Sequence, residues 1–325
     1  MTRLGYLGIM AEHDLVISVE EAVRRLQHGE VVAIPTETVY GLAARIDDEG
    51  AIRRIFTLKG RPADNPLIVH VANRTQAADL AEVSDVAAAL MDRFWPGPLT
   101  IVLTKNDGVS DLVTAGLDTV AVRMPASPTA LEILRRLDVP LAAPSANRSG
   151  RPSATQAQHV LDDHGDAVAV VDGGACHEGL ESTVVRPLAD RILLLRPGVI
   201  SRADLTEATG LPVMDPDADD VRRSPGTRHR HYAPAVPVEL FDDLDDLRRS
   251  VGNGNVMILA ATDPNSGGIW KPLTGPTVFT EFRDAERLGV DKILVHLTEA
   301  VRTDEALMNR LRRASEPAND ETSNS

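Results

Sequence analysis

Short apolar runs alternate with amphipathic stretches along the first two thirds of the chain. Runs typical of buried strands lie at 30–35, 67–70, 99–103, 120–125, 140–143, 167–171, 181–185 and 192–195. Apolar positions at helical spacing predict helices over 18–27, 50–59, 128–137 and 155–162, and one or two helices over 75–94. Strands separated by helices indicate an α/β domain with a mixed sheet, which we place at residues 15–208.

The stretch that follows the second predicted helix is a stiff loop leading into a strand. Gly60 stands where a C-cap glycine is expected, and Pro62 prevents the helix from continuing. The loop has little backbone freedom and carries Lys59, Arg61 and Asn65. Two cations and an amide on such a loop suit an anion such as a polyphosphate. Taken alone, the cations are explained more simply as complements to the negative end of the helix dipole.

Polar residues also gather where other strands end. The segment PTETVYG at 35–41 is bounded by a proline and a glycine, which favour a shaped loop of the kind that holds ligand groups in α/β proteins. The segment APSAN at 143–147 carries Ser145 and Asn147, which are also ordinary turn formers. Ser153 is expected to cap the helix at 155–162.

Arg123 interrupts an otherwise apolar strand. It alternates with Val120 and Val122, and a charge in a central strand is costly to bury without a partner. Either Arg123 faces solvent on an edge strand, or it holds a ligand that bears a carboxylate; the strand alone favours neither.

The last third of the chain has a different organisation. Residues 214–220 are acidic and poor in apolar residues, which predicts a linker over 209–235, although SPGTRHRHYAP at 224–234 within it is basic. The two histidines there have no evident third ligand, so we predict no metal site. Strands at 238–241, 256–260 and 292–296 and helices at 244–251 and 307–313 indicate a smaller Rossmann-like α/β domain over 236–315. Residues 316–325 are polar and expected to be disordered.

Composition narrows the class of protein. A formal net charge of −14 over 325 residues argues against general polyanion binding, because nonspecific affinity for nucleic acid comes from clustered basic charge. A single cysteine excludes an internal disulfide and a cysteine-built zinc site. No run is apolar enough to span a membrane, and the first ten residues lack the features of a signal peptide. We expect a cytoplasmic protein, with Met10 as an alternative start.

Several motifs in one order resemble the YrdC-type threonylcarbamoyl-AMP synthases. They are PTETVYG at 35–41, KGRP at 59–62, NPL at 65–67, WPGPLT at 95–100, VAVRMP at 120–125, APSAN at 143–147, EST at 181–183 and LRPG at 195–198. Each is weak alone, but the set is specific and covers about residues 15–234. The segment at 224–234 and MNRLRRAS at 308–315 resemble the longer, two-domain branch of this family. The resemblance implies a YrdC-like twisted mixed sheet flanked by helices.

The resemblance also implies an activity. The family makes L-threonylcarbamoyladenylate from L-threonine, bicarbonate or CO2, and ATP, and releases pyrophosphate. The product supplies N6-threonylcarbamoyladenosine at position 37 of tRNAs that read ANN codons, through a separate threonylcarbamoyl-transfer complex. We therefore expect a nucleotidyltransferase that uses Mg²⁺ with ATP and that does not bind nucleic acid stably.

By resemblance, each motif carries part of the site. Threonine is expected at Thr38, His70, Arg123, the Ala143 backbone and Ser182. ATP is expected at Arg61, Asn65, Thr119, Ser145, Ser153, Arg196 and Tyr232, with the tyrosine as a lid. Lys59, Arg61, Ser145 and Asn147 are the expected catalytic residues. Mg²⁺ is expected on phosphate oxygens rather than in a protein cage.

Three other functions compete with this hypothesis. An RNA-binding module is disfavoured by the overall acidity. A nucleotide-binding regulator that has lost activity is disfavoured because Lys59, Arg61, Ser145 and Asn147 are all present. The related fold of dihydroxybutanone phosphate synthase does not fit the loop at 61–70 or Tyr232.

Overall fold

The apolar runs of the first domain form one ten-stranded mixed sheet in the computed structural model, which describes residues 15–217, 220 and 232–316. The strand order is β10-β9-β8-β4-β5-β3-β6-β2-β1-β7. The strands are β1 (Val32–Ile34), β2 (Gly41–Arg45), β3 (Ile68–His70), β4 (Leu99–Thr104), β5 (Thr119–Arg123), β6 (Leu141–Ala142), β7 (Ala169–Val170), β8 (Thr183–Pro187), β9 (Ile192–Arg196) and β10 (Val213–Met214). The mixed α/β sheet that the sequence predicts is therefore confirmed.

Helices begin and end where the sequence supplies caps. They are α1 (Val19–Gln27), α2 (Glu49–Lys59), α3 (Arg74–Leu80), α4 (Asp85–Phe94), α5 (Asp111–Thr114), α6 (Pro128–Leu137), α7 (Ala157–His164) and α8 (Arg202–Thr209). The Ser18 side chain accepts a hydrogen bond from the Glu21 amide at the start of α1, and Gly60 ends α2 with φ of 60°. The prediction that Ser153 caps the next helix is wrong. Helix α7 begins at Ala157, with Gln156 at the N-cap position and no side-chain cap. The Ser153 hydroxyl donates to Glu181 instead.

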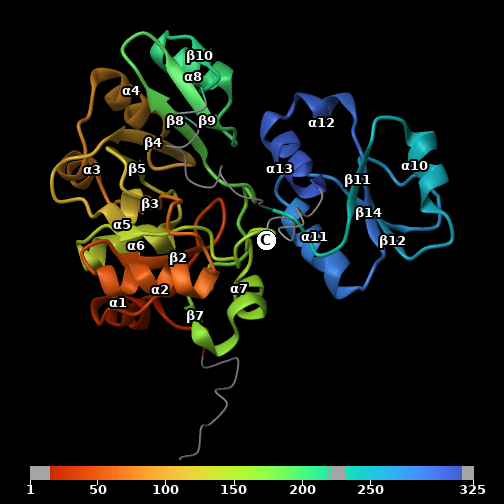
Figure 1. The fold of residues 1–325 in the computed structure, drawn as a ribbon, viewed down its shortest axis with the longest axis horizontal. Coiled ribbons are helices and arrows are strands. Elements are labelled where there is room, and N and C mark those ends of the chain that lie inside the picture. The colour runs from red at the N-terminus through yellow and green to blue at the C-terminus, as the bar shows by residue number, and fades with distance from the viewer. Residues whose placement is uncertain (1–14, 218–219, 221–231, 317–325) are drawn as a thin grey trace, which may run out of the picture.

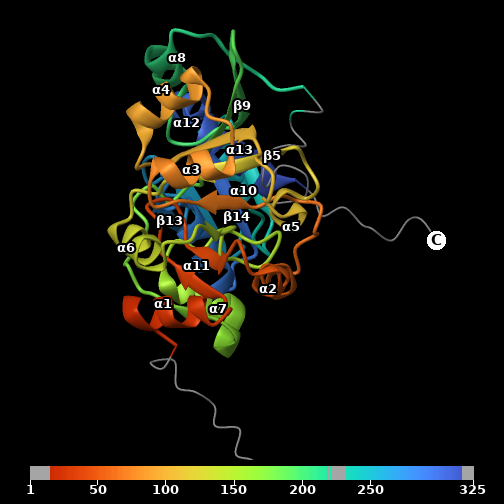
Figure 2. The ribbon, with the colours of Figure 1, turned by 90° about the vertical axis from the view of Figure 1, so that its left-hand side faces the viewer.

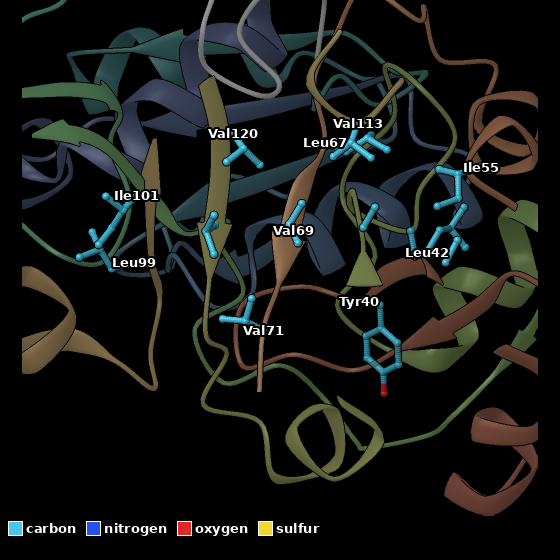
Figure 3. Close-up of a cluster of buried hydrophobic side chains, with 14 of the residues drawn as sticks. Tyr40, Leu42, Ile55, Leu67, Val69, Val71, Leu99, Ile101, Val113 and Val120 are labelled. Atoms are coloured by element: carbon cyan, nitrogen blue, oxygen red, sulfur yellow. The ribbon is translucent and has the colours of Figure 1, made fainter. Parts of the chain in front are cut away.

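Alternation along the strands divides the core between the two faces of the sheet. Val69 of β3 joins the large apolar cluster that includes Ile55 of α2 (Figure 3). Leu90 of α4 belongs to the same cluster. Its neighbour Ile68 belongs to a separate cluster with Ala121 of β5. Because side chains two apart share a face, residues 70 and 123 lie on the same face as residues 68 and 121. This face of the sheet, away from α2 and α4, carries the site described below.

The last third of the chain forms a second, four-stranded sheet in which all paired neighbours are parallel. Its order is β11-β14-β12-β13, with β11 (Val238–Phe241), β12 (Val256–Ala260), β13 (Ile269–Pro272) and β14 (Lys292–His296). The helices are α10 (Leu244–Val251), α11 (Val278–Arg287), α12 (Glu299–Thr303) and α13 (Glu305–Ser315). Helices α11 and α13 lie between this sheet and the first domain, and α10 lies on the far side (Figure 1). Figure 2 shows the first domain from the side opposite this junction.

The predicted domain borders differ from the structure in detail. Strand β10 pairs with β9 in the large sheet although it falls inside the predicted linker at 209–235. Strand β13 and helices α11 and α12 were not anticipated. The Met10 start, most of the basic segment at 224–234 and the predicted tail after residue 316 lie outside the described residues. Among the residues that are described, no helix has both the length and the apolar character needed to cross a bilayer.

Candidate functional site

A cavity opens on the sheet face away from α2 and α4, at the junction of the two domains. It is lined by Thr36, Thr38, Val39, Tyr40, Gly41, Arg61, Pro66, Ile68, His70, Arg123, Ala143, Pro144, Ser145, Asn147, Glu181, Ser182, Arg196 and Tyr232. These residues come from loops and strand ends that are distant in sequence. The structure thus brings together most of the residues that the sequence singled out.

Arg123 lies on the floor of the cavity and not on a sheet edge. Its strand β5 lies between β4 and β3, and Arg123 is paired in register with His70. The side chain is buried, and it donates to the Gly97 carbonyl at 3.2 Å and to Thr38 Oγ1 at 2.9 Å. The solvent-facing alternative is therefore excluded.

Glu37 provides the charge partner of Arg123. Its Oε1 lies 2.7 Å from Arg123 Nη2, and both side chains are almost fully buried. Burial is the largest single influence on Glu37 and raises its pKa, but the Arg123 charge and hydrogen bonds to the carboxylate together leave the pKa below its usual value. Glu37 is therefore a carboxylate, and the pair is electrically neutral.

His70 is uncharged in this setting. Burial, together with the nearby Arg123 charge, lowers its pKa to about 3. Its Nδ1 has no hydrogen-bond partner in the described part of the chain. A buried ring nitrogen of this kind is able to accept or donate a hydrogen bond to a small polar ligand.

Lys59 and Arg61 point to different places although only Gly60 separates them. Lys59 Nζ donates to the carbonyl oxygens of Ser145 and Asn147, so it fastens the 145–147 loop to the end of α2. Burial lowers the pKa of Lys59 well below its usual value, and Arg61 adds to this effect. Arg61 lines the cavity, where its Nη2 donates to the Pro66 carbonyl at 2.9 Å.

The 145–147 loop is held from three directions. The Ser145 hydroxyl donates to Asn147 Oδ1 at 2.6 Å, and Asn147 Nδ2 donates to the carbonyls of Arg148 and Arg151. His164 Nε2 contacts the Ala146 carbonyl at 2.6 Å. Together with Lys59, these contacts give the Ser145 and Asn147 side chains fixed positions at the cavity wall.

Arg61 and Arg196 make the cavity attractive to anions. Both are buried, and in the described part of the chain neither lies within ion-pair distance of a carboxylate. Arg196 donates to the Ser182 carbonyl at 3.0 Å and to the Ser182 hydroxyl at 3.2 Å. Burial lowers the pKa of Arg61 to about 10, which still leaves it charged at neutral pH. Two buried guanidinium groups that make no ion pair within the described residues suit a polyanionic ligand.

Four predicted site residues do not line the cavity. Lys59 binds the 145–147 loop, and Asn65 accepts from Arg61 through its backbone carbonyl at 3.4 Å. Thr119 is buried at the start of β5, and its hydroxyl has no hydrogen-bond partner among described residues. Ser153 is fully buried and donates to Glu181.

Sequence reasoning missed Glu37, Tyr40 and Glu181. Glu37 and Glu181 are buried carboxylates paired with arginines, and Tyr40 donates to the Gly174 carbonyl at 2.8 Å. All three lie inside motifs that carry the family resemblance, so the signal was their position beside predicted site residues. The described residues contain no group of three or more His, Cys, Asp or Glu side chains placed to hold a metal ion.

Two family models match the chain. Residues 24–198 match a model described as "Telomere recombination", which groups the Sua5, YciO and YrdC proteins. Residues 200–316 match a model described as "Threonylcarbamoyl-AMP synthase, C-terminal domain". The two matches correspond to the two sheets of the structure, except that α8 and β10 fall within the second.

Individual relatives support the same grouping. The chain is 41% identical over 313 residues to the threonylcarbamoyl-AMP synthase of Pyrococcus abyssi, covering 89% of this chain and 92% of the relative. It is 46% identical over 230 residues to that of Bacillus subtilis, covering 69% and 66%. The crystal structure of P. abyssi Sua5 complexed with L-threonine has a TM-score of 0.83 and 39% identity, covering 91% of this chain and 94% of that one.

Proposed function

Since the chain belongs to the Sua5/YrdC family of threonylcarbamoyl-AMP synthases, we propose that it makes L-threonylcarbamoyladenylate from L-threonine, bicarbonate or CO2, and ATP, with release of pyrophosphate. The observation that carries the proposal is the cavity itself. It combines two buried guanidinium groups that make no ion pair within the described residues, Arg61 and Arg196, with a neutral polar floor around His70 and Arg123. The first feature suits a triphosphate and the second suits an amino acid.

Threonine binds on the sheet floor in this proposal. Its carboxylate approaches Arg123, and its remaining polar groups face Thr38, His70, Ser182 and the Ala143 backbone. Arg123 uses only part of its five N–H donors for Gly97, Thr38 and Glu37, so the bound carboxylate can share this guanidinium with Glu37. The crystal structure of the P. abyssi protein with L-threonine supports threonine as the amino acid.

ATP binds on the side of Arg61, Ser145, Arg196 and Tyr232, with Asn65, Thr119 and Ser153 in support. The threonine amine adds to CO2 with loss of a proton, or condenses with bicarbonate with loss of water, to give a carbamate. A carbamate oxygen then attacks the α-phosphorus, and the bond from this phosphorus to the bridging oxygen breaks, so that pyrophosphate leaves with the bond electrons. Fixed cations near the phosphates lower the barrier because they offset the charge that develops there.

Lys59 acts in this scheme by fixing Ser145 and Asn147, since its ammonium group is already bound to their carbonyls. A closed cavity protects the labile carbamate from water. ATP arrives as its Mg²⁺ complex, with the ion on phosphate oxygens, because Glu37 and Glu181 are engaged by arginines. The product passes to a separate complex that modifies adenosine 37 of tRNAs reading ANN codons.

Pyrophosphate release tests the proposal. We expect release from MgATP only when both threonine and bicarbonate are present, and a fall of at least 100-fold in kcat/KM in Arg61→Ala, since this removes a charge from the phosphate side. The matched control is Arg54→Ala, which removes an exposed arginine from helix α2 and should leave the rate unchanged.

Other outcomes would contradict the proposal in distinct ways. Release that does not need threonine would indicate an ATPase or another acceptor. Binding of ATP by the folded protein without any release would favour a regulatory nucleotide-binding protein.

A further inference from the structure

The second domain places one fully buried arginine against the wall of the cavity. Arg310 of α13 has no exposed surface, and its Nε donates to Glu181 Oε2 at 2.9 Å. Its Nη1 donates to the Pro197 carbonyl at 2.9 Å, and its guanidinium carbon lies 5.1 Å from the centre of the Tyr232 ring. One side chain of the second domain therefore contacts three segments that line or adjoin the cavity.

Glu181 explains why this contact matters for an anionic ligand. It lines the cavity, and its second oxygen accepts the Ser153 hydroxyl. Without a counter-charge, a buried carboxylate at this position would repel a triphosphate. Arg310 makes the ion pair with Glu181 from outside the first domain, and the nearby Arg196 charge adds to its effect. With this pair in place, neither Arg61 nor Arg196 makes an ion pair within the described residues, so both can face the ligand.

Arg310 also affects the cavity through its contact with the Tyr232 ring. The Tyr232 backbone has φ of 69°, a conformation that an aromatic residue keeps only when its surroundings hold it there. Its ring stacks on Phe279 of α11 at a centroid distance of 5.4 Å, and Arg310 lies on the ring at 5.1 Å. The side chain is thereby fixed where it lines the cavity.

We propose that Arg310 is a positioning residue of the active site, through which the second domain neutralises Glu181 and fixes Tyr232 for ATP binding. The proposal rests on the proposed function for the identity of the ligand. It gives the second domain a specific part in the reaction. Arg310 should affect the binding of ATP and not of threonine, because it contacts neither His70 nor Arg123 on the floor of the cavity.

The structure offers a matched control in a second buried ion pair between the domains. Arg283 of α11 donates to Asp163 at 2.7 Å and also to the Pro152 carbonyl at 2.6 Å. None of the groups that Arg283 contacts lines the cavity. Arg283→Met therefore removes a comparable junction contact whose direct partners, Asp163 and Pro152, do not line the cavity.

The test compares steady-state kinetics and Tm for Arg310→Met and Arg283→Met. We expect both variants to lose stability, but only Arg310→Met to raise the KM for ATP, by at least tenfold, with the KM for threonine changed less than threefold. Equal kinetic constants for the two variants would overturn the proposal, as would a KM for threonine that rises as much as that for ATP.

Two further measurements keep the result interpretable. If Arg310→Met does not fold, the double variant Glu181→Gln with Arg310→Met removes both charges. It should still bind ATP at least tenfold more weakly, since Tyr232 has lost its support, and a wild-type KM would overturn the proposal. If the wild-type protein releases no pyrophosphate, the proposed function fails, and MgATP affinity measured by calorimetry in the same variants still decides the role of Arg310.

Discussion

At the scale of single residues, the site depends on how buried charges are paired. Arg123 is paired with Glu37, and Glu181 is paired with Arg310, so the two buried carboxylates at the site each have an arginine. Breaking such a pair by removing one partner typically costs about 3–5 kcal/mol, because the remaining charge stays buried. His70 differs from these residues, since it is buried outside any ion pair among the described residues and is uncharged.

The neutral state of His70 predicts how stability responds to acid. The unfolded chain takes up a proton near pH 6.5, but burial lowers the pKa of His70 to about 3 in the folded protein. Between these values the unfolded state binds more protons, so stability falls as the pH is lowered. From pH 7.5 to 5 this group alone should reduce the free energy of unfolding by about 2 kcal/mol. Urea unfolding at both pH values measures this effect. The fall in the free energy of unfolding from pH 7.5 to 5 should be about 2 kcal/mol smaller in His70→Gln than in wild type.

Exposed His28 provides the control for this measurement. His28→Gln should keep the full acid dependence of the wild type. His159 and His164 are buried as well and are retained in both variants, so their contribution cancels in the comparison. An acid dependence in His70→Gln as steep as in wild type would contradict the prediction.

At the scale of elements, strand and helix ends put the chemistry in place. The left-handed turn at Gly60 sends Lys59 to one loop and Arg61 into the cavity. Register between β3 and β5 sets His70 beside Arg123. Much of this follows from local signals in the sequence. The helix predicted at 128–137 has the observed bounds of α6, because Ser127 caps it and Pro128 suits its first turn.

Local signals failed where long-range contacts decide the structure. Ser153 has the usual chemistry of a helix cap, but its hydroxyl is drawn to Glu181, 28 residues away. Strand β13 is short, only half-buried and at a sheet edge, so its apolar pattern is weak. The pairing of Glu181 with Arg310 spans 129 positions, and no periodicity in the sequence encodes it. Arg123 was ambiguous for the same reason, since its partner Glu37 comes from a different part of the chain.

The turn after α2 makes a prediction at this scale. No atom lies within 4 Å of a Cβ added to Gly60, so a substitution there meets only backbone strain. With φ of 60°, Gly60→Ala should lower the free energy of unfolding by about 1–2 kcal/mol. Gly60→Asn should cost less, because asparagine tolerates the left-handed region. Urea unfolding of both variants provides the measurement, and equal losses would contradict this account of the turn.

At the scale of the whole molecule, charge is distributed unevenly. The chain carries a net charge of −14, yet its cavity gathers Arg61 and Arg196, neither of which makes an ion pair within the described residues. A concave basic site inside an acidic protein admits a small anion such as ATP, whereas a long polyanion meets the repulsive outer surface. Helices α11 and α13 close the side of the first domain where this cavity lies (Figure 1).

This distribution predicts weak binding to tRNA. In an electrophoretic mobility-shift titration at about 0.15 M salt, we expect a dissociation constant no tighter than the nonspecific range of about 10⁻⁴–10⁻⁶ M. Further added salt should abolish any residual shift, since only phosphate contacts would contribute. Submicromolar binding that survives 0.3 M salt would instead favour a direct RNA-binding role.

The way in which the two domains share Leu180 has a consequence for protein engineering. This residue lies in the first domain, just before β8, yet its side chain packs in the apolar cluster of the second domain. Gly179 beside it is so close to the Pro276 backbone that any side chain there would collide with it. A fragment made by cutting the chain after β10 would therefore expose the apolar side chain of Leu180 and would leave Glu181 without its ion-pair partner Arg310. Shortening this enzyme requires a redesigned surface at 179–181 as well as a new end to the chain.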